Sequence, residues 1–332
     1  MRRSLLLVPL LALLACSRSS PAPAPVLSEP AASSDDRQAA TITILTTNAA
    51  DMVGKGEWSF AAWVETSEGA LLFDTGWSPR NVLENAEALG IDLSVAENLV
   101  LSHHHGDHTG GLVTLRRELM KRNPKALSRI HVAEGIFTSR PGSGGSERNP
   151  MLAARAEIEA TGAEFIIHEE PAEIAPGVWV TGPVPRVHDE RTYPRGPERI
   201  LEEAGEIRPD TVPESQSLLV VAEGGPILVS GCGHAGLINT LEYSRGRIVD
   251  EPVQSAIGGF HLFAADDEVL QWTAERASDA GLGGFLGSHC TGFESVYRIR
   301  DLAGLSRDSA RVGAIGTRYV AGSGIVPGAI NR

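Results

Sequence analysis

Residues 103–108 read HHHGDH, so four of the ten histidines of the chain lie within six residues, beside a carboxylate. Imidazole and carboxylate groups are ligands that proteins offer to zinc and similar divalent cations. His103 and His105 alternate, and an extended backbone directs both side chains the same way. Asp107 and His108 then face a second position. The spacing predicts a binding site for one or two divalent metal ions.

The residues around this stretch support the same interpretation. An apolar strand pattern at 98–102 leads into the histidines. His104 falls between the two alternating ligands, so we expect it to bind no metal directly. Asp74 ends the strand pattern at 70–74, just before Gly76. A carboxylate there can hold a ligand imidazole through its other ring nitrogen, and a turn aspartate is compatible with that position.

From residue 41 onward, short β-branched or apolar runs alternate with helical periodicity, a pattern typical of layered α/β folds. The predicted strands lie at 41–47, 60–66, 70–74, 98–102, 129–133, 164–168, 217–222, 226–230, 256–260 and 284–288. The predicted helices lie at 79–89, 111–122, 151–161, 237–244, 266–280 and 294–302. Stretches rich in Gly and Pro at 138–150 and 182–216 are predicted to be loops.

Composition places the chain among ordinary globular proteins. Of its 332 residues, 42% are hydrophobic and 21% are charged, and the formal net charge is −13. These values exclude a disordered or collagen-like protein, and three cysteines are too few for a disulfide framework. No run of Lys and Arg offers a stripe for phosphates, so we expect no nucleic-acid partner.

The first forty residues predict an export signal and a tether. A basic start precedes an apolar run at 5–14, which is too short to span a bilayer comfortably. The letters LLAC at 13–16 resemble a bacterial lipobox, in which Cys16 is lipidated; a plain signal peptide with an incidental cysteine is the alternative. We expect a signal peptide at 1–15, lipidated Cys16 with a disordered linker at 16–40, and a catalytic domain at 41–332. The protein would then be attached to the bacterial cell envelope, in the periplasm or at the cell surface, through that lipid alone.

The HxHxDH pattern at 103–108 resembles the signature of the metallo-β-lactamase superfamily. The segments LLFDTG at 71–76 and LS at 101–102 precede it in the order that this family shows. The resemblance covers residues 41–332. It implies an αββα sandwich, in which two mixed β-sheets are flanked by helices, and it implies one or two zinc ions or another divalent metal.

Later segments resemble one subgroup of that superfamily. They are EIAPGVWVTG at 173–182, SGCGHAGLIN at 230–239, IGGFHL at 257–262 and HCTG at 289–292. They look like proteins called dihydropteroate-synthase-like or 7,8-dihydropterin-6-methyl-4-(β-D-ribofuranosyl)-aminobenzene-5′-phosphate synthase. That name implies a transferase, although a lipidated exported protein is an unexpected place for pterin biosynthesis.

The resemblance also implies a third histidine for the first metal position and a late histidine for the second. His234 follows an apolar strand pattern between glycines, so we expect it to complete the first position. His289 ends another strand pattern, and we expect it to complete the second. His261 also ends a strand, and we expect it to contact metal or substrate. The other histidines are expected to have other roles: His131 and His168 as structural residues in strands, and His188 in a loop.

The bridging aspartate that the superfamily usually carries is missing, and Cys232 lies near its place. A Cys232 thiolate would bind a metal directly. Alternatively, Cys232 and Cys290, each beside a candidate ligand, would form a disulfide in an oxidising compartment. A third possibility is that both are small buried residues.

These features predict a metal-dependent hydrolase with a small-molecule substrate. Metal-activated water would attack an ester, lactone, amide or phosphodiester, with Asp107 and His108 as catalytic residues and Asp107 orienting the water. One alternative is a transferase acting on a pterin-like substrate, and another is a non-enzymatic metal-binding lipoprotein. Four tryptophans are candidates to line a pterin pocket: Trp58, Trp63, Trp77 and Trp179.

Overall fold

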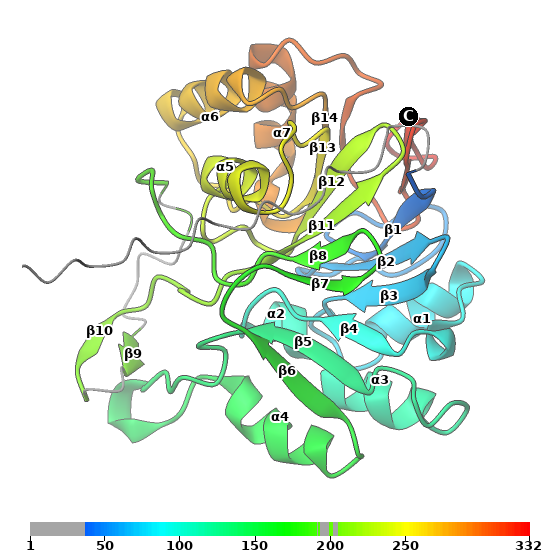
Figure 1. Ribbon diagram of the computed structural model, residues 1–332, viewed down its shortest axis with the longest axis vertical. Coiled ribbons are helices and arrows are strands. Elements are labelled where there is room, and N and C mark those ends of the chain that lie inside the picture. The colour runs from blue at the N-terminus through cyan, green and yellow to red at the C-terminus, as the bar shows by residue number, and fades with distance from the viewer. Residues whose placement is uncertain (1–36, 191, 193–198, 202–204) are drawn as a thin grey trace, which may run out of the picture. The chain divides into compact units, whose positions relative to one another are not determined.

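A computed structural model describes residues 37–190, 192, 199–201 and 205–332. These residues fold into four layers, in which two β-sheets pack face to face and helices cover the outer face of each sheet (Figure 1). The α/β class and the αββα sandwich predicted from the sequence are therefore confirmed. The predicted signal peptide at 1–15 and the predicted lipidation site, Cys16, lie outside the described residues.

The first sheet has the strand order β17-β16-β1-β2-β3-β4-β5-β6. Its strands are β1 (Ala40–Thr46), β2 (Ala61–Thr66), β3 (Gly69–Phe73), β4 (Asn98–Val100), β5 (Arg129–Ala133), β6 (Glu164–His168), β16 (Arg318–Val320) and β17 (Gly324–Val326). Neighbours from β3 to β6 run parallel, and the other neighbours run antiparallel. Its outer face is covered by α1 (Asn81–Ala88), α3 (Leu112–Leu119) and α4 (Pro150–Glu159) (Figure 1).

The second sheet has the strand order β15-β14-β13-β12-β11-β8-β7. Its strands are β7 (Ala172–Ala175), β8 (Val178–Val180), β11 (Ser217–Ala222), β12 (Gly225–Ser230), β13 (Ser255–Gly258), β14 (Gly284–Gly287) and β15 (Ala310–Val312). The strands from β12 to β15 run parallel. Its outer face is covered by α5 (Leu237–Arg247), α6 (Asp267–Asp279) and α7 (Phe293–Leu302) (Figure 1).

Alternation along the central strands divides their side chains between three apolar layers. Leu71 of β3 and Leu218 of β11 belong to the layer between the two sheets. Their neighbours Leu72 and Leu219 face the helices on opposite outer sides. Because both faces of each sheet are buried, the central strands read as nearly continuous apolar runs, which is why the sequence predicted them.

The loops that follow five parallel strands carry the chemically interesting residues. They are Asp74 after β3, 103–108 after β4, 231–236 after β12, His261 after β13, and His289 after β14. The short helix α2 (Gly106–Thr109) lies within the second of these loops. Ligand sites in α/β sheets lie beyond the carboxyl ends of the parallel strands, so the topology places the candidate site there.

The sequence failed to predict several short strands. β7, β8, β15, β16 and β17 contain only three or four residues each, too few to show a clear alternation. The strands β9 (Arg199–Leu201) and β10 (Ile207–Pro209) pair with each other inside the stretch 182–216. The prediction of a loop throughout that stretch is wrong for these residues.

The folded body begins a few residues before the predicted boundary at residue 41. Arg37 forms a 2.6 Å ion pair with Glu251, and β1 starts at Ala40. Within the part of the chain that the structure describes, no helix has the length and apolar character needed to cross a membrane.

Candidate metal centre

Three groups of side chains place one ligand atom each within 4.8 Å of the others in the same group. These groups are His103, His105 and His234; Asp107, His108, Cys232 and His289; and Cys232, His234 and His261. Shared members join the groups into one set of eight residues, which we call the ligand cluster. It contains every residue that the sequence assigned to metal, and this set of donors is able to bind a metal ion.

The ring of His103 is oriented by the residue before it. Ser102 Oγ donates its hydrogen to Asp74 Oδ2 at 2.7 Å, so it accepts one from His103 Nδ1 at 2.9 Å. The neutral His103 ring therefore carries its lone pair at Nε2, which lies 2.9 Å from His105 Nδ1. The His103 and His234 rings are centred 4.7 Å apart. A cation shared by these nitrogens would satisfy their lone pairs together.

His234 completes the first group from the loop after β12. Its Nδ1 donates to the backbone carbonyl of Thr192, which leaves the lone pair of the neutral ring at Nε2. That Nε2 atom is buried and has no hydrogen-bond partner among the described residues. A buried polar atom without a partner costs about 1–3 kcal/mol, and a metal ion beside His103 would remove this cost. The residues present therefore fit a metal ion.

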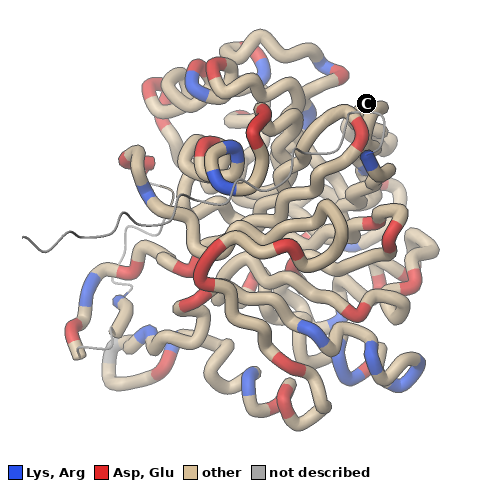
Figure 2. Tube along the Cα trace, in the orientation of Figure 1, with Lys and Arg blue, Asp and Glu red and all other residues tan. Residues whose placement is uncertain are grey.

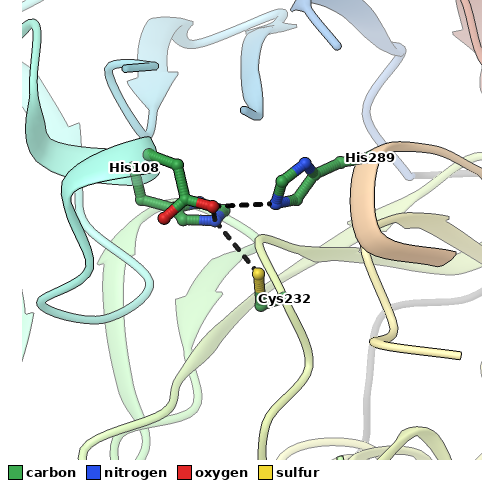
Figure 3. A group of neighbouring side chains, drawn as sticks. His108, Cys232 and His289 are labelled. Atoms are coloured by element: carbon green, nitrogen blue, oxygen red, sulfur yellow. Dashed lines mark hydrogen bonds and ion pairs between the residues drawn. The ribbon is translucent and has the colours of Figure 1, made fainter. Parts of the chain in front are cut away.

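The second group brings together side chains from three loops, and Figure 3 shows His108, Cys232 and His289 pointing toward one another. His108 Nε2 lies 3.1 Å from Cys232 Sγ and 3.7 Å from Asp107 Oδ2. His289 Nε2 lies 3.2 Å from the same Asp107 oxygen. The backbone N–H of His289 donates to Thr47 Oγ1, which holds the loop after β14 against the end of β1. Imidazole, carboxylate and thiol donors together suit zinc.

Asp74 fixes the orientation of His108 in the second group. Its Oδ2 accepts from His108 Nδ1 at 2.7 Å, and its Oδ1 accepts from the Ser102 backbone N–H at 2.7 Å. The lone pair of a neutral His108 ring is thereby directed toward Cys232. Gly231 packs against Ser102 and Asp74, because a Cβ at its position would lie 2.2 Å from Ser102 Oγ and 2.5 Å from Asp74 Oδ2. Asp74 thus contacts the second ring nitrogen of a candidate ligand, as its position in the sequence predicted.

Burial keeps the first group uncharged. It lowers the pKa of His103 and of His234 well below the usual range. It also lowers the pKa of His105 to about 3. Neutral imidazole is the form that binds metal, so these three side chains are ready to do so at neutral pH.

The second group carries opposite charges. Burial alone would lower the pKa of His108, but the carboxylates of Asp107 and Asp74 outweigh it and raise that pKa to about 9. Burial would raise the pKa of Asp107, but the neighbouring His108 and His289 rings outweigh it, so this pKa is lowered. A metal ion entering this group would displace the proton of His108.

A cavity of about 1120 Å³ lies beside the ligand cluster, between residues 187–190 and 192 on one side and α6 on the other. His261 belongs to the ligand cluster and also lines the cavity, and its ring is centred 4.7 Å from that of His234. Its φ of +49° is unusual for a residue with a side chain, and such conformations gather at functional sites. The apolar part of the cavity wall consists of Val187, Leu262, Phe263, Ala264, Ala265, Val269 and Trp272.

The four tryptophans considered in the sequence analysis have different surroundings. Trp63 is buried in the apolar layer between the first sheet and its helices. Trp179 packs against the apolar layer between the second sheet and its helices. Trp58 and Trp77 are about half exposed, with 48% and 58% of their surface accessible. The Trp58 ring is centred 5.0 Å from His289 and 5.5 Å from Phe263, so it lies at the edge of the ligand cluster.

His104 turns away from the ligand cluster into a buried ionic network. Its Nδ1 lies 2.5 Å from Glu214 Oε1, and Arg140 donates to the other Glu214 oxygen at 2.6 Å. Arg140 Nε also donates to Asp210 Oδ2 at 3.1 Å. All four side chains are buried. They support the histidine stretch from its far side, and His104 is in none of the three groups.

Three other histidines lie outside the ligand cluster. His131 Nδ1 and His168 Nε2 lie 3.0 Å apart, and His131 Nε2 lies 3.0 Å from Asn98 Oδ1, so this pair joins neighbouring strands. His188 lines the cavity, with its Nε2 2.9 Å from Glu242 Oε2.

Sequence reasoning missed three residues that shape the site. Ser102 stands directly before the histidine stretch, and its position there was an available signal. Thr192 lies in the proline-rich stretch and Trp272 on a helix, and neither carried a local signal. Their roles depend on segments that meet only in the folded chain.

A sequence profile of the metallo-β-lactamase superfamily matches residues 59–249 of the chain. The chain is 30% identical over 248 residues to 7,8-dihydropterin-6-methyl-4-(β-D-ribofuranosyl)-aminobenzene-5′-phosphate synthase of Methanocaldococcus jannaschii. That match covers 71% of this chain and 81% of the relative. An uncharacterized protein of the same organism is 26% identical over 265 residues, which is 79% of this chain and 94% of the relative.

Two solved structures are similar to this one. Tm1679, described as a metal-dependent hydrolase of the β-lactamase superfamily, has a TM-score of 0.66 and 24% identity, covering 84% of this chain and 98% of its own. The metallo-β-lactamase-fold protein YhfI from Bacillus subtilis has a TM-score of 0.52 and 12% identity, covering 85% and 100%. At these identities, the likeness shows the shared fold.

Proposed function

This chain belongs to the metallo-β-lactamase superfamily, and we propose that it is a metal-dependent hydrolase of a small molecule that carries an ester, lactone, amide or phosphodiester bond. One observation carries the proposal: the group that contains His103 lies next to the group that contains Asp107. The third group joins them, because it takes His234 from the first and Cys232 from the second. Two adjacent sets of donors are what a binuclear hydrolytic centre requires.

The donors favour zinc over a harder cation. Each group contains imidazoles, and the second adds the Cys232 thiol to the Asp107 carboxylate. Magnesium and calcium prefer oxygen ligands, whereas zinc accepts nitrogen and sulfur. We therefore propose one or two zinc ions as the cofactor.

A divalent ion held by these residues would supply a Lewis acid and, at neutral pH, a hydroxide nucleophile. The Asp107 carboxylate, which lies between His108 and His289, would orient the attacking water by accepting a hydrogen bond from it. His108 keeps this carboxylate ionised. We propose catalytic roles for these two residues, because both are donors of the second group.

The cavity beside His261 would hold the part of the substrate that does not react. It is large enough for a small molecule, and its wall combines apolar side chains with the polar groups of His188 and Glu190. His261 stands between the cavity and the ligand cluster, so it would contact the substrate next to the reacting bond.

A transferase acting on a pterin-like substrate is the second candidate. The relative that is 30% identical carries the name of a synthase whose product contains a dihydropterin. Trp272 in the cavity wall offers an aromatic surface for such a ring. A protein that consumes a pterin and an aryl acceptor without hydrolysing any ester or lactone would favour this candidate.

Metal analysis of the purified full-length chain tests the centre. We expect about two equivalents of zinc in the wild type and about one in His234→Ala. His168→Ala is the matched control, because it removes an imidazole that belongs neither to the ligand cluster nor to the cavity wall. Unchanged zinc in His234→Ala would overturn the assignment of the first group.

A substrate panel then tests the reaction. Esters, lactones, β-lactams and phosphodiesters are offered to both variants and to the wild type. We expect hydrolysis of at least one class, lost in His234→Ala and retained in His168→Ala. Full metal content with no hydrolysis of any class would move the assignment to the transferase.

We also propose that the protein is exported and attached to the cell envelope through lipidated Cys16, with no nucleic-acid partner. The signal-like sequence at 1–16 supports the first part. In Figure 2, Lys and Arg are scattered among Asp and Glu over both halves of the view, in line with the second. Mass spectrometry of the N-terminal peptide tests lipidation, and Cys16→Ser is expected to move the protein to the soluble fraction.

A further inference from the structure

Two thiols meet at the inner side of the ligand cluster. Cys232 Sγ and Cys290 Sγ lie 3.3 Å apart, and both are free and buried. Cys232 follows β12, whereas Cys290 lies in the 3-10 turn His289–Thr291 after β14. The pair therefore joins two loops that are separated by 58 residues in the chain.

The two thiols differ in their other contacts. Cys232 Sγ lies 3.1 Å from His108 Nε2 and belongs to two of the three donor groups. Cys290 Sγ belongs to none of the groups found among the described residues, and it accepts from the His261 backbone N–H at 3.3 Å. One thiol thus belongs to the groups that could hold a metal, and the other contacts its sulfur atom.

We propose that Cys232 and Cys290 are a site of reversible oxidative modification, at which a peroxide converts the pair to a disulfide and removes the Cys232 sulfur from the donor set. The second half of this statement rests on the proposed metal centre. The first half rests on the thiol pair alone.

The chemistry balances with hydrogen peroxide as the oxidant. One thiolate attacks a peroxide oxygen, the O–O bond breaks, and the cysteine becomes a sulfenic acid. The second thiol then attacks that sulfur, a disulfide bond forms, and water leaves. Two thiols and one peroxide yield one disulfide and two waters, and a dithiol reductant reverses the change.

The geometry permits this closure. A disulfide bond is about 2.05 Å long, so the two sulfur atoms must approach by roughly 1.3 Å. Cys232 stands between Gly231 and Gly233, and Gly233 has a φ of +59°, so the loop around the moving sulfur has no flanking side chains. Neither thiol lines the cavity, but His261 does, and its backbone N–H contacts Cys290 Sγ, so an oxidant in the cavity would be one residue away from the pair.

A disulfide and a Cys232–metal bond exclude one another, because both use the same sulfur. The modification would therefore remove one of the four donors of the second group and weaken metal binding there, while leaving His103, His105 and His234 unchanged. Bound metal would in turn protect Cys232 from oxidation. This reciprocity distinguishes a switch at the site from incidental damage.

Peptide mapping of the full-length chain tests the modification. Chelator-treated protein is exposed to hydrogen peroxide, alkylated, digested with trypsin without reduction and weighed. We expect the peptides 200–245 and 277–298 to be linked, at two hydrogen masses below their sum. Cys16 lies on a different tryptic peptide, so its reactions are seen separately. The link should vanish in Cys290→Ser and after dithiothreitol treatment.

Metal content tests the consequence. Zinc reconstituted into oxidised wild type should reach about half the level reached in reduced wild type. Cys290→Ser should keep the reduced wild-type level, whereas Cys232→Ser should show the lower level without any oxidant. Two alkylatable thiols after peroxide, with no linked peptide, would overturn the modification whatever the metal results are. A linked peptide with unchanged zinc would overturn the coupling to the metal, and it would leave the proposed hydrolase intact.

Discussion

Asp74 Oδ2 lies 2.7 Å from His108 Nδ1, across 34 residues of sequence, and both side chains are completely buried. The same carboxylate also accepts from the backbone and the hydroxyl of Ser102, whose Oγ in turn contacts His103. One aspartate therefore orients His108 of the second group directly and His103 of the first group through Ser102.

Asp74→Asn tests this relationship. An amide cannot accept from His108, Ser102 and the backbone as the carboxylate does, so both ligand rings lose their fixed orientation. We expect metal affinity to fall by about 10- to 100-fold at both positions. Competition with a fluorescent zinc chelator gives the affinities. Glu118→Gln, on the exposed face of α3, is the control. Equal affinities in the two variants would contradict the role of Asp74.

Gly231→Ala should damage the same arrangement by crowding. The new Cβ would lie 2.2 Å from Ser102 Oγ and 2.5 Å from Asp74 Oδ2, so one of the two must move. We expect a loss of about 1–3 kcal/mol in the free energy of unfolding and weaker metal binding. Gly246→Ala is the matched control, because nothing lies near its Cβ and it stands within α5. That change should stabilise the chain by about 0.5–1 kcal/mol. Urea unfolding measures both, and a neutral Gly231→Ala would refute the argument.

Glu214 predicts a pH dependence of stability. Burial raises its pKa, but His104 and Arg140 outweigh burial and lower it from 4.5 to about 2. Since the folded-state pKa is the lower one, the carboxylate stabilises the fold above pH 4.5. That contribution is lost as the pH falls toward 2. Glu214→Gln should cost about 3 kcal/mol at neutral pH and flatten the acid limb of the stability curve. A variant that keeps the wild-type acid limb would assign that limb to other groups.

Trp272→Ala tests the cavity as the substrate site. Trp272 lines the cavity and belongs to none of the three donor groups, so its loss should remove binding energy without touching the reacting bond. We expect KM to rise about tenfold with kcat nearly unchanged, for whichever panel substrate is hydrolysed. Tyr243→Ala on α5 removes a ring outside the cavity and should leave both constants unchanged. A fall in kcat alone would place the substrate elsewhere.

The sequence predicted the layers well because both faces of the central strands are buried. The run 217–222 is apolar except for its first residue, and the structure shows a strand with the same bounds. The α5 prediction ended at residue 244, whereas the helix continues to Arg247, because one glycine at an exposed position does not end a helix. The three-residue strands depend on their neighbours in the sheet, and their own residues do not reveal them.

For the site, the local spacing of residues was informative, whereas contacts between distant segments could not be predicted from the sequence. The alternation of His103 and His105 is visible in six letters, as is the glycine setting of His234. By contrast, Cys232 had three open interpretations, and choosing among them requires knowing that the loop after β12 meets the loop after β14. The cavity that His261 lines depends on α6 lying opposite residues 187–190 and 192, and no sequence motif marks this arrangement.

The ligand cluster draws its donors from both halves of the sandwich. Asp74 and the histidine stretch follow strands of the first sheet, and Cys232, His261 and His289 follow strands of the second. A bound ion would therefore link the two sheets, which elsewhere pack against each other through apolar side chains. Removal of the ion by a chelator should first loosen the loops that carry the donors. Hydrogen exchange should therefore rise in these loops while the apolar layer between the sheets stays protected.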